Sequence, residues 1–237
     1  MIGIFIQIFA LILAYLLGSI PVALILGKKV KHIDIREYGS KNMGATNAFR
    51  VLGFKWGALT FLLDAIKGAI VVIFMKYIIV LFPIYTDEYF LFYLNPLFYA
   101  LASFIGHLYP IFAHFKGGKG VSTGFGGVFA YAPLSSLTCL IIFIIVISIF
   151  KFVSLASIVS CFFAPFVFLG FSYLLYGNID WYLFIGVTII SLIIIIKHIP
   201  NLKRLHNHTE QMVNFKAIKD SNEPPFIDNP KANKEEK

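Results

Sequence analysis

Long apolar runs separated by short polar segments make up most of the chain. The apolar runs cover residues 1–27, 52–82, 91–113, 121–150, 152–176 and 180–199. A helix needs about 20 apolar residues to cross roughly 30 Å of hydrocarbon, and several of these runs reach that length. The pattern therefore predicts an all-α integral membrane protein and excludes the soluble classes.

The longest apolar run, 121–150, is interrupted near its middle. Ala132 precedes Pro133, and proline disfavours helix both at its own position and at the residue before it. We expect the chain to turn there, so that 121–132 is a partial span. The six apolar runs then form seven transmembrane or partial-span helices.

The distribution of charge supports seven helices rather than six. The basic segments are 28–55, 116–119, Lys151 and the region from Lys197 onward. The segments 83–90 and 177–180 contain acidic residues but neither Lys nor Arg. Basic loops stay in the cytoplasm, and only an odd number of crossings puts every basic segment there. This predicts an external N-terminus, a cytoplasmic C-terminus and two external acidic loops.

The composition agrees with a membrane location. The 237 residues are 59% hydrophobic, carry a net charge of +8 and have a mean hydropathy of +0.83. The opening residues lack a basic stretch and a small-residue cleavage site, so we expect a retained first span. Cys139 and Cys161 lie in apolar runs, where buried thiols are expected rather than a disulfide or a metal site. Residues 1–214 are predicted to form one membrane domain, and 215–237, rich in Pro, Asn and Lys, a disordered cytoplasmic tail.

Three polar segments, 37–53, 106–124 and 197–210, fall on the cytoplasmic side of this topology. Each combines glycine, amide or hydroxyl residues with cations. A glycine-rich turn lets backbone N–H groups converge on an anion, a helix N-terminus adds its positive end, and Lys or Arg neutralises the charge. In HFKGGKGVSTGFG (114–126), glycines flank Lys119 just before an expected helix. Such segments can hold phosphate.

Plainer interpretations of these residues stay open. Gly120 and Gly124 form a G-x-x-x-G pair that helix packing alone can require. Lysines in cytoplasmic loops also mark topology, and single histidines more often make structural hydrogen bonds than take part in chemistry. Asp64 and Lys67, three apart on a helix, can neutralise each other, which favours a structural role beneath the polar site.

Two familiar kinds of site are missing from the sequence. Gly120, rather than Ser or Thr, follows Lys119, so the pattern of a nucleotide P-loop is not matched. The chain has only twelve acidic residues, and no cluster of them suits Mg²⁺. We expect no metal, no cofactor and no nucleic-acid partner.

At these polar residues the chain resembles the acyl-phosphate-dependent glycerol-3-phosphate acyltransferases, a family of small bacterial membrane enzymes. The resemblance covers about residues 1–212 and excludes the C-terminal tail. The motifs that carry it are GSKNMGATNAFRVLG (39–53), LDAIKG (63–68), GHLYPIFAHFKGGKGVSTG (106–124) and NLKRLHNHTE (201–210). Within the last motif, HNHTE departs from the family pattern, in which a Lys-Gly-rich step precedes Thr-Glu.

The resemblance implies a fold, an activity and a location. Seven helices would surround a site that faces the cytoplasm in the inner membrane of a bacterium. The activity would be transfer of a fatty acyl group from acyl phosphate to the 1-hydroxyl of glycerol 3-phosphate, giving 1-acylglycerol 3-phosphate for phospholipid synthesis. The implied partners are the two substrates and membrane lipids, with the upstream enzyme that forms acyl phosphate as a further candidate.

By the same resemblance, the candidate site residues come from the three polar segments. Those with catalytic roles are Ser40, Lys119, Asn201 and His206, and those expected to bind substrate are Lys41, Asn42, Thr46, Asn47, Arg50, Gly117, Gly118, Gly120, Ser122, Thr123 and Glu210. Lys119 and the amides around it are assigned to acyl phosphate. Arg50 and Lys41 are assigned to the phosphate of glycerol 3-phosphate, which Asn47 would orient. Ser40 and His206 would donate or accept hydrogen bonds near the reacting carbonyl and hydroxyl groups.

Alternatives remain for the mechanism and for the class of protein. Acyl phosphate is already activated, so we expect direct transfer in a ternary complex, aided mainly by electrostatic positioning. Either His206 or a substrate phosphate would accept the hydroxyl proton, whereas a covalent acyl-Ser40 intermediate would show ping-pong kinetics. A transporter of a small phosphorylated anion is the rival class, but its polar residues should spread through the membrane depth rather than gather at one surface.

Overall fold

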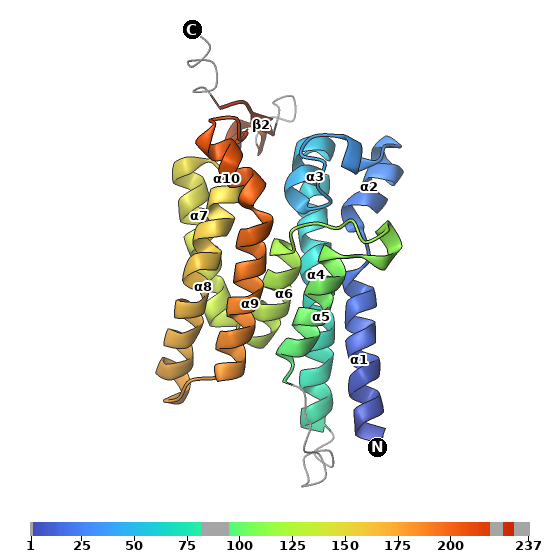
Figure 1. The fold of residues 1–237 in the computed structure, drawn as a ribbon, viewed down its shortest axis with the longest axis vertical. Helices are drawn as coiled ribbons and strands as arrows, with labels where there is room; N and C mark the ends of the chain where they lie inside the picture. Colours follow the sequence, from blue (N-terminus) through green and yellow to red (C-terminus); the bar gives the residue numbers. More distant parts are fainter. Residues whose placement is uncertain (1, 82–94, 219–224, 230–237) are drawn as a thin grey trace.

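The structure, a computed structural model, describes residues 2–81, 95–218 and 225–229. Helices make up most of these residues (Figure 1). The α-helices are α1 (Ile2–Gly18), α2 (Val22–Lys31), α3 (Ala45–Leu52), α4 (Phe54–Leu81), α5 (Leu97–Leu108), α6 (Val121–Tyr131), α7 (Pro133–Phe150), α8 (Val153–Tyr176), α9 (Trp181–Lys197) and α10 (Ile199–His206). Short 3₁₀ turns are η1 (Ile35–Glu37), η3 (Ile111–Ala113) and η4 (Phe215–Ile218), and the strands are β1 (Met212–Val213) and β2 (Phe226–Ile227). Apart from these two short strands, the described residues confirm the predicted all-helical fold.

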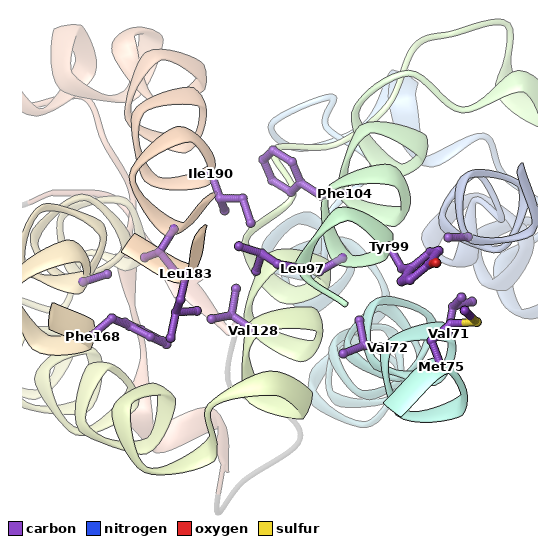
Figure 2. Close-up of a cluster of buried hydrophobic side chains, with 14 of the residues drawn as sticks. Val71, Val72, Met75, Leu97, Tyr99, Phe104, Val128, Phe168, Leu183 and Ile190 are labelled. Atoms are coloured by element: carbon purple, nitrogen blue, oxygen red, sulfur yellow. The ribbon is translucent and has the colours of Figure 1, made fainter. Parts of the chain in front are cut away.

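The helix α6 lies at the centre of the arrangement. It contacts α4 and α5 on one side and α7 and α9 on the other. Beside it, α1 packs with α4 and α5, while α7 packs on α8 and α8 on α9. One cluster of buried apolar side chains joins both groups and includes Phe104 of α5, Val128 of α6 and Phe168 of α8 (Figure 2). The two groups of helices are therefore held side by side around α6.

Four of the described helical segments are long and apolar enough to cross a membrane. They are Ile4–Lys31, Phe54–Tyr77, Pro133–Phe150 and Val153–Tyr176, and the bent pair Trp181–Lys197 and Ile199–His206 makes a fifth if it counts as one span. These lengths fit a protein with several membrane spans, whereas the seven crossings and the orientation of the ends stay predictions. The predicted external loop 83–90 lies outside the described residues.

The chain turns at the predicted break in its longest apolar run. α6 ends at Tyr131 and α7 begins with Pro133, a first-turn position where proline removes no helical hydrogen bond. α6 starts just after Lys119, which contacts α10, and α7 ends just before Lys151, whose carbonyl oxygen accepts a hydrogen bond from Val213 N of β1 at 2.8 Å. Both helices therefore reach the same end of the molecule and run in opposite directions (Figure 1).

Part of the predicted tail is folded in the structure. β1 and β2 pair antiparallel, with Met212 opposite Ile227 and Val213 opposite Phe226. Ala217 of η4 is buried. Residues 215–218 and 225–229 thus differ from the predicted disorder, because backbone pairing and contacts with the helices order them.

Glycines bring α4 and α6 into backbone contact. A Cβ atom at Gly126 of α6 would lie 1.9 Å from the carbonyl oxygen of Ala65 in α4. One at Gly68 of α4 would lie 2.1 Å from the carbonyl oxygen of Thr123 in α6. Only residues without a side chain allow this approach, which is a common way for helices to associate within a bilayer.

We expect the substitution Gly126→Ala to destabilise the protein, because the added methyl group must push α6 away from α4. Overpacking of this kind costs about 1–3 kcal/mol. The thermal unfolding midpoint of the detergent-solubilised protein should fall by several degrees. Gly170→Ala is the matched control, since a Cβ atom at Gly170 in α8 meets nothing within 4 Å. Equal midpoints for the two variants would contradict this view of the interface.

Candidate active site

A cavity of about 460 Å³ lies between α3, α4 and α6 on one side and α7 to α10 on the other. Its polar lining brings together residues of all three polar segments: Ser40, Asn42, Thr46, Asn47, Arg50, Lys119, Gly120, Ser122, His198, Asn201 and Glu210. The rest of the lining is mainly apolar and includes Phe143 of α7, Phe168 of α8 and Ile190 of α9. One cavity thus joins a charged end to an apolar body.

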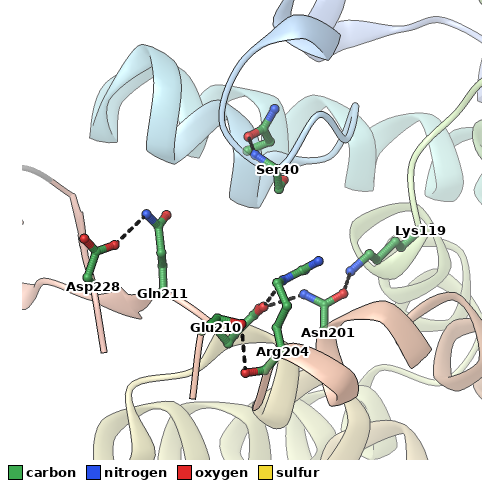
Figure 3. A network of polar contacts seen from close by, with 9 residues as sticks. Ser40, Lys119, Asn201, Arg204, Glu210, Gln211 and Asp228 are labelled. Carbon is green, nitrogen blue, oxygen red and sulfur yellow. Dashed lines mark hydrogen bonds and ion pairs between the residues drawn. The ribbon is translucent and has the colours of Figure 1, made fainter. Parts of the chain in front are cut away.

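A line of hydrogen bonds connects the second and third polar segments (Figure 3). Lys119 Nζ donates to Asn201 Oδ1, and Asn201 Nδ2 donates to Glu210 Oε1 at 2.7 Å. Arg204 Nε donates to Glu210 Oε2, also at 2.7 Å. Asn201 and Glu210 are buried, so their geometry is held by partners on both sides. The amide of Asn201 therefore links a cation to a carboxylate and fixes where the Lys119 ammonium lies.

Burial lowers the pKa of Lys119 to about 8. Glu210 opposes this shift because its negative charge favours the ammonium form, whereas the positive charges of Arg204 and Arg50 add to it. Desolvation also lowers the pKa of Arg50, although a guanidinium stays charged throughout the physiological range. At pH 7 the site therefore holds a protonated Lys119 that an anion would stabilise.

In the first polar segment, Asn47 shapes the loop that carries Ser40. Asn47 Oδ1 accepts from Ser40 N at 2.8 Å, and Asn47 Nδ2 donates to the carbonyl oxygens of Ile35 and Tyr38, both at 3.1 Å. Gly39, with φ of +59°, turns the chain around this side chain, and a Cβ there would lie 2.4 Å from Asn47 Oδ1. Asn47 was predicted to orient the substrate, but its amide makes its hydrogen bonds to the backbone in this structure.

The glycines of the second polar segment allow the loop to pack on α5. A Cβ atom at Gly117 would lie 2.1 Å from the carbonyl oxygen of His107, and one at Gly118 would lie 2.2 Å from His107 Nε2. Gly118 N donates to the same carbonyl oxygen at 3.2 Å. Gly120 has φ of +83° and packs on the ring of Phe104. Close packing therefore accounts for the glycines at these positions. The N–H of Gly118 already donates a hydrogen bond to a backbone carbonyl oxygen.

Some predicted residues lie outside the cavity lining. They are Lys41, Gly117, Gly118, Thr123 and His206. Lys41 and His206 are exposed, and Thr123 is buried where α6 meets α4.

His198 was not among the predicted site residues, but it lines the cavity, whereas the predicted His206 does not. His198 is buried, and its Nδ1 is 2.8 Å from the carbonyl oxygen of Ile194. Donation from Nδ1–H to that oxygen leaves Nε2 as a hydrogen-bond acceptor. The signal in the sequence is the spacing His-x-x-Asn, because residues three apart on a helix share a face and Asn201 was already a candidate.

A second charged cluster closes the base of the polar end. Lys67 Nζ lies 2.7 Å from Asp64 Oδ1, and His107 Nδ1 lies 3.7 Å from the same oxygen. Lys67 Nζ also donates to the carbonyl oxygen of Ile20 at 2.8 Å. The predicted contact between Asp64 and Lys67 is confirmed. Across residues 2–81, 95–218 and 225–229, no group of three His, Cys, Asp or Glu side chains is placed to hold a metal ion.

We expect the amine of Lys119 to become reactive as the pH rises through about 8. The extent of its acetylation by a small neutral reagent, measured on the peptide by mass spectrometry, should show a midpoint there. Glu210→Gln removes the charge that favours the ammonium, so the midpoint should fall. Arg204→Gln removes a repelling charge, so the midpoint should rise. Shifts of the same sign in both variants would contradict the electrostatic account.

Three comparisons with known proteins agree with one another. A sequence profile described as glycerol-3-phosphate acyltransferase matches residues 8–208. Relatives with that name include one from Bacillus subtilis (strain 168), 41% identical over 207 residues that span 86% of this chain and 96% of the relative. Another, from Listeria welshimeri, is 37% identical over 206 residues, or 86% of this chain and 95% of the relative.

A solved structure gives the same answer. It is described as the glycerol 3-phosphate form of PlsY, an integral membrane glycerol 3-phosphate acyltransferase, and it matches with a TM-score of 0.75 at 35% identity. The match covers 90% of this chain and 98% of that one. The lysophosphatidic acid form of the same protein gives a TM-score of 0.71. With a matching profile, close relatives and a shared fold over most of its length, this chain belongs to the glycerol-3-phosphate acyltransferase family.

Proposed function

We propose that this protein transfers a fatty acyl group from acyl phosphate to the 1-hydroxyl of glycerol 3-phosphate. Acylation of glycerol 3-phosphate is the activity that its family is named for, and the donor and the hydroxyl position are the finer parts of the proposal. The main support for this function is one observation. Lys119 and its hydrogen-bonded partners lie at the charged end of a cavity whose remaining lining is mainly apolar. A small phosphorylated acceptor and a fatty chain can meet there.

The two cations that line the cavity suit two different phosphates. Arg50 presents a planar fork that can bind phosphate through two parallel hydrogen bonds, and we assign it to glycerol 3-phosphate. Lys119 is a compact point charge, and we assign it to acyl phosphate, where it stabilises the phosphate as it leaves. Lys41 was predicted to assist Arg50, but its exposed position outside the lining leaves that role to Arg50.

The reaction is a direct transfer between the two bound substrates. The 1-hydroxyl oxygen attacks the acyl carbonyl carbon, a carbon–oxygen bond forms there, and the bond from that carbon to the phosphate oxygen breaks. The hydroxyl proton passes to His198 Nε2 or to the departing phosphate, so His198 takes the place predicted for His206. Ser40 lines the cavity and donates a hydrogen bond near the carbonyl. Positioning and charge stabilisation supply most of the catalysis, because acyl phosphate is already activated.

We further propose that the chain crosses the inner membrane of a bacterium seven times, with the N-terminus outside and the charged end of the cavity facing the cytoplasm. The basic segments support this orientation, and the reversal between α6 and α7 supports an odd number of crossings. Water-soluble glycerol 3-phosphate then enters from the cytoplasm. The fatty chain lies in the apolar body, next to membrane lipids. An enzyme that forms acyl phosphate is a candidate partner on the same side.

This topology predicts which of two reporter fusions is active. A reporter that is active only in the cytoplasm should give no signal when it is fused after Pro133, because the turn between α6 and α7 faces outward. The same reporter fused after Lys151 should be active, because α7 has returned to the cytoplasmic side. Whole-cell reporter activity, corrected for the amount of fusion protein, measures both. A strong signal after Pro133 would contradict seven crossings.

The activity itself is tested with purified protein, labelled glycerol 3-phosphate and palmitoyl phosphate, without added metal. We expect 1-acylglycerol 3-phosphate as the product. Lys119→Ala should lower kcat/KM about 100-fold or more, the usual effect of removing a group that stabilises developing charge. Lys116→Ala is the matched control, since that lysine is exposed and lies outside the cavity lining. His198→Ala should likewise lose far more activity than His206→Ala.

The assay also separates the alternatives. Product formed only from acyl-CoA would overturn the donor. Uptake of glycerol 3-phosphate into vesicles with no acylated product would favour a transporter. Trapping of acylated Ser40 would overturn direct transfer.

A further inference from the structure

The described part of the C-terminal segment, residues 211–218 and 225–229, lies over the charged end of the cavity. We name these residues the C-terminal strap. β1 and β2 pair within it, and Asn214 N donates to the carbonyl oxygen of Pro225 at 3.0 Å. Gln211 Nε2 donates to Asp228 Oδ1 at 3.1 Å (Figure 3). Val213 N donates to the carbonyl oxygen of Lys151, which ties the strap to the junction of α7 and α8.

The strap contributes part of the cavity lining. Its lining residues are Val213, Asn214, Phe215, Ala217, Pro225 and Phe226. All of them follow residue 208, where the match to the family profile ends. The alignment with the Bacillus subtilis relative covers 96% of that protein but 86% of this chain, so this chain carries additional length. The strap therefore adds walls to the cavity that the match to the family does not account for.

The strap reaches a site cation through one aromatic ring. The Cζ atom of Arg50 lies 4.6 Å from the centroid of the Phe226 ring. A cation at this distance over an aromatic face is attracted by the negative charge density of that face, and the attraction grows when water is excluded. Arg50 Nε is buried and has no hydrogen-bond partner among the described residues. The ring of Phe226 is thus a contact that can hold this guanidinium in place.

The geometry leaves room for a ligand on the same guanidinium. The five N–H bonds of arginine diverge in the plane of the guanidinium, so one ring near Cζ cannot occupy all of them. A phosphate can bind through two parallel N–H donors that the ring leaves free. Contact with the ring limits rotation of the guanidinium before the ligand arrives, and a pre-oriented group loses less entropy on binding.

We propose that Phe226 of the C-terminal strap is a positioning residue for the acceptor substrate: it orients Arg50 for the phosphate of glycerol 3-phosphate. The inference rests on the proposed function. Phe226 acts through Arg50 and takes no part in bond making or breaking. Its loss should therefore raise the KM for glycerol 3-phosphate and leave kcat close to its original value.

The test uses the full chain and compares substitutions of similar size. Phe226→Leu keeps an apolar side chain without a ring, and it should raise the KM for glycerol 3-phosphate about three- to tenfold, as expected for loss of a partly desolvated cation–π contact. Phe226→Tyr keeps the ring and should retain the original KM. Ile227→Ala is the matched control, since Ile227 is the next residue of β2, is exposed and lies outside the cavity lining.

A double substitution tests whether Phe226 acts through Arg50. Arg50→Lys removes the planar fork, so adding Phe226→Leu to it should raise the KM little further. Independent, multiplying effects of the two substitutions would overturn the proposal. So would an unchanged KM in Phe226→Leu, a KM that falls because the ring had blocked the site, or a loss of kcat that Phe226→Tyr fails to restore.

Failure of this inference is distinguishable from failure of the proposed function. A wild-type chain that forms no acylated product under any donor overturns the function. If the wild type is fully active and Phe226→Leu leaves the KM for glycerol 3-phosphate unchanged, only the role of the strap is overturned.

Discussion

The positions of both site cations depend on the backbone contact between α4 and α6. α3, which carries Arg50, runs into α4 through Gly53 alone, and α6 begins two residues after Lys119. Where the backbones touch at Gly68 and Gly126, neither helix can shift without moving one of these cations. Apolar side chains gain little by leaving lipid for protein, so close packing of this kind must supply the association of helices within a bilayer. The interface thus sets the separation of Arg50, on α3, from Lys119, in the loop before α6.

The cations at the charged end of the cavity outnumber the acids that face them. Arg50, Lys119 and Arg204 approach one carboxylate, that of Glu210, whereas Asp64 deeper in the protein is already matched by Lys67. Burial disfavours a charge that lacks a counter-charge, which is why the pKa values of Lys119 and Arg50 both lie below their ordinary values. A bound phosphate would supply the missing negative charge. Binding of a phosphate would therefore lower the free energy of a site in which positive charge is in excess. This gain would contribute to the affinity for phosphate.

Features that depend on local sequence could be predicted, and features that depend on tertiary contacts could not. The apolar runs and the turn at Ala132 and Pro133 follow from local patterns. Lys119 and Asn201 were assigned to one site through the family resemblance of their motifs. The position of His198 in the cavity lining was not predicted. His198 lies three residues before Asn201, whereas His206 lies five residues after it, roughly 140° around the helix axis. The glycines beside Lys119 suggested an anion site, and the structure adds a packing reason for them: Gly117 and Gly118 lie against His107, and Gly120 lies against Phe104. The polar composition of the strap likewise gave no sign of its contact with Arg50.

The cavity would place the proposed reaction at a boundary between a polar and an apolar environment. Charged groups gather at one end, and the walls contributed by α7, α8 and α9 are mainly apolar. An acyl phosphate has the same division, with a charged head and a fatty chain, and the bond to be broken lies between them. In the proposed reaction, alignment of the two boundaries would put the reacting carbonyl beside Lys119 without any specific contact along the fatty chain. A low-dielectric wall on one side would strengthen the interaction of Lys119 with the departing phosphate of the proposed donor. Under the proposed function, the apolar body of the cavity would therefore contribute to catalysis through the electrostatics of its charged end as well as through binding of the fatty chain.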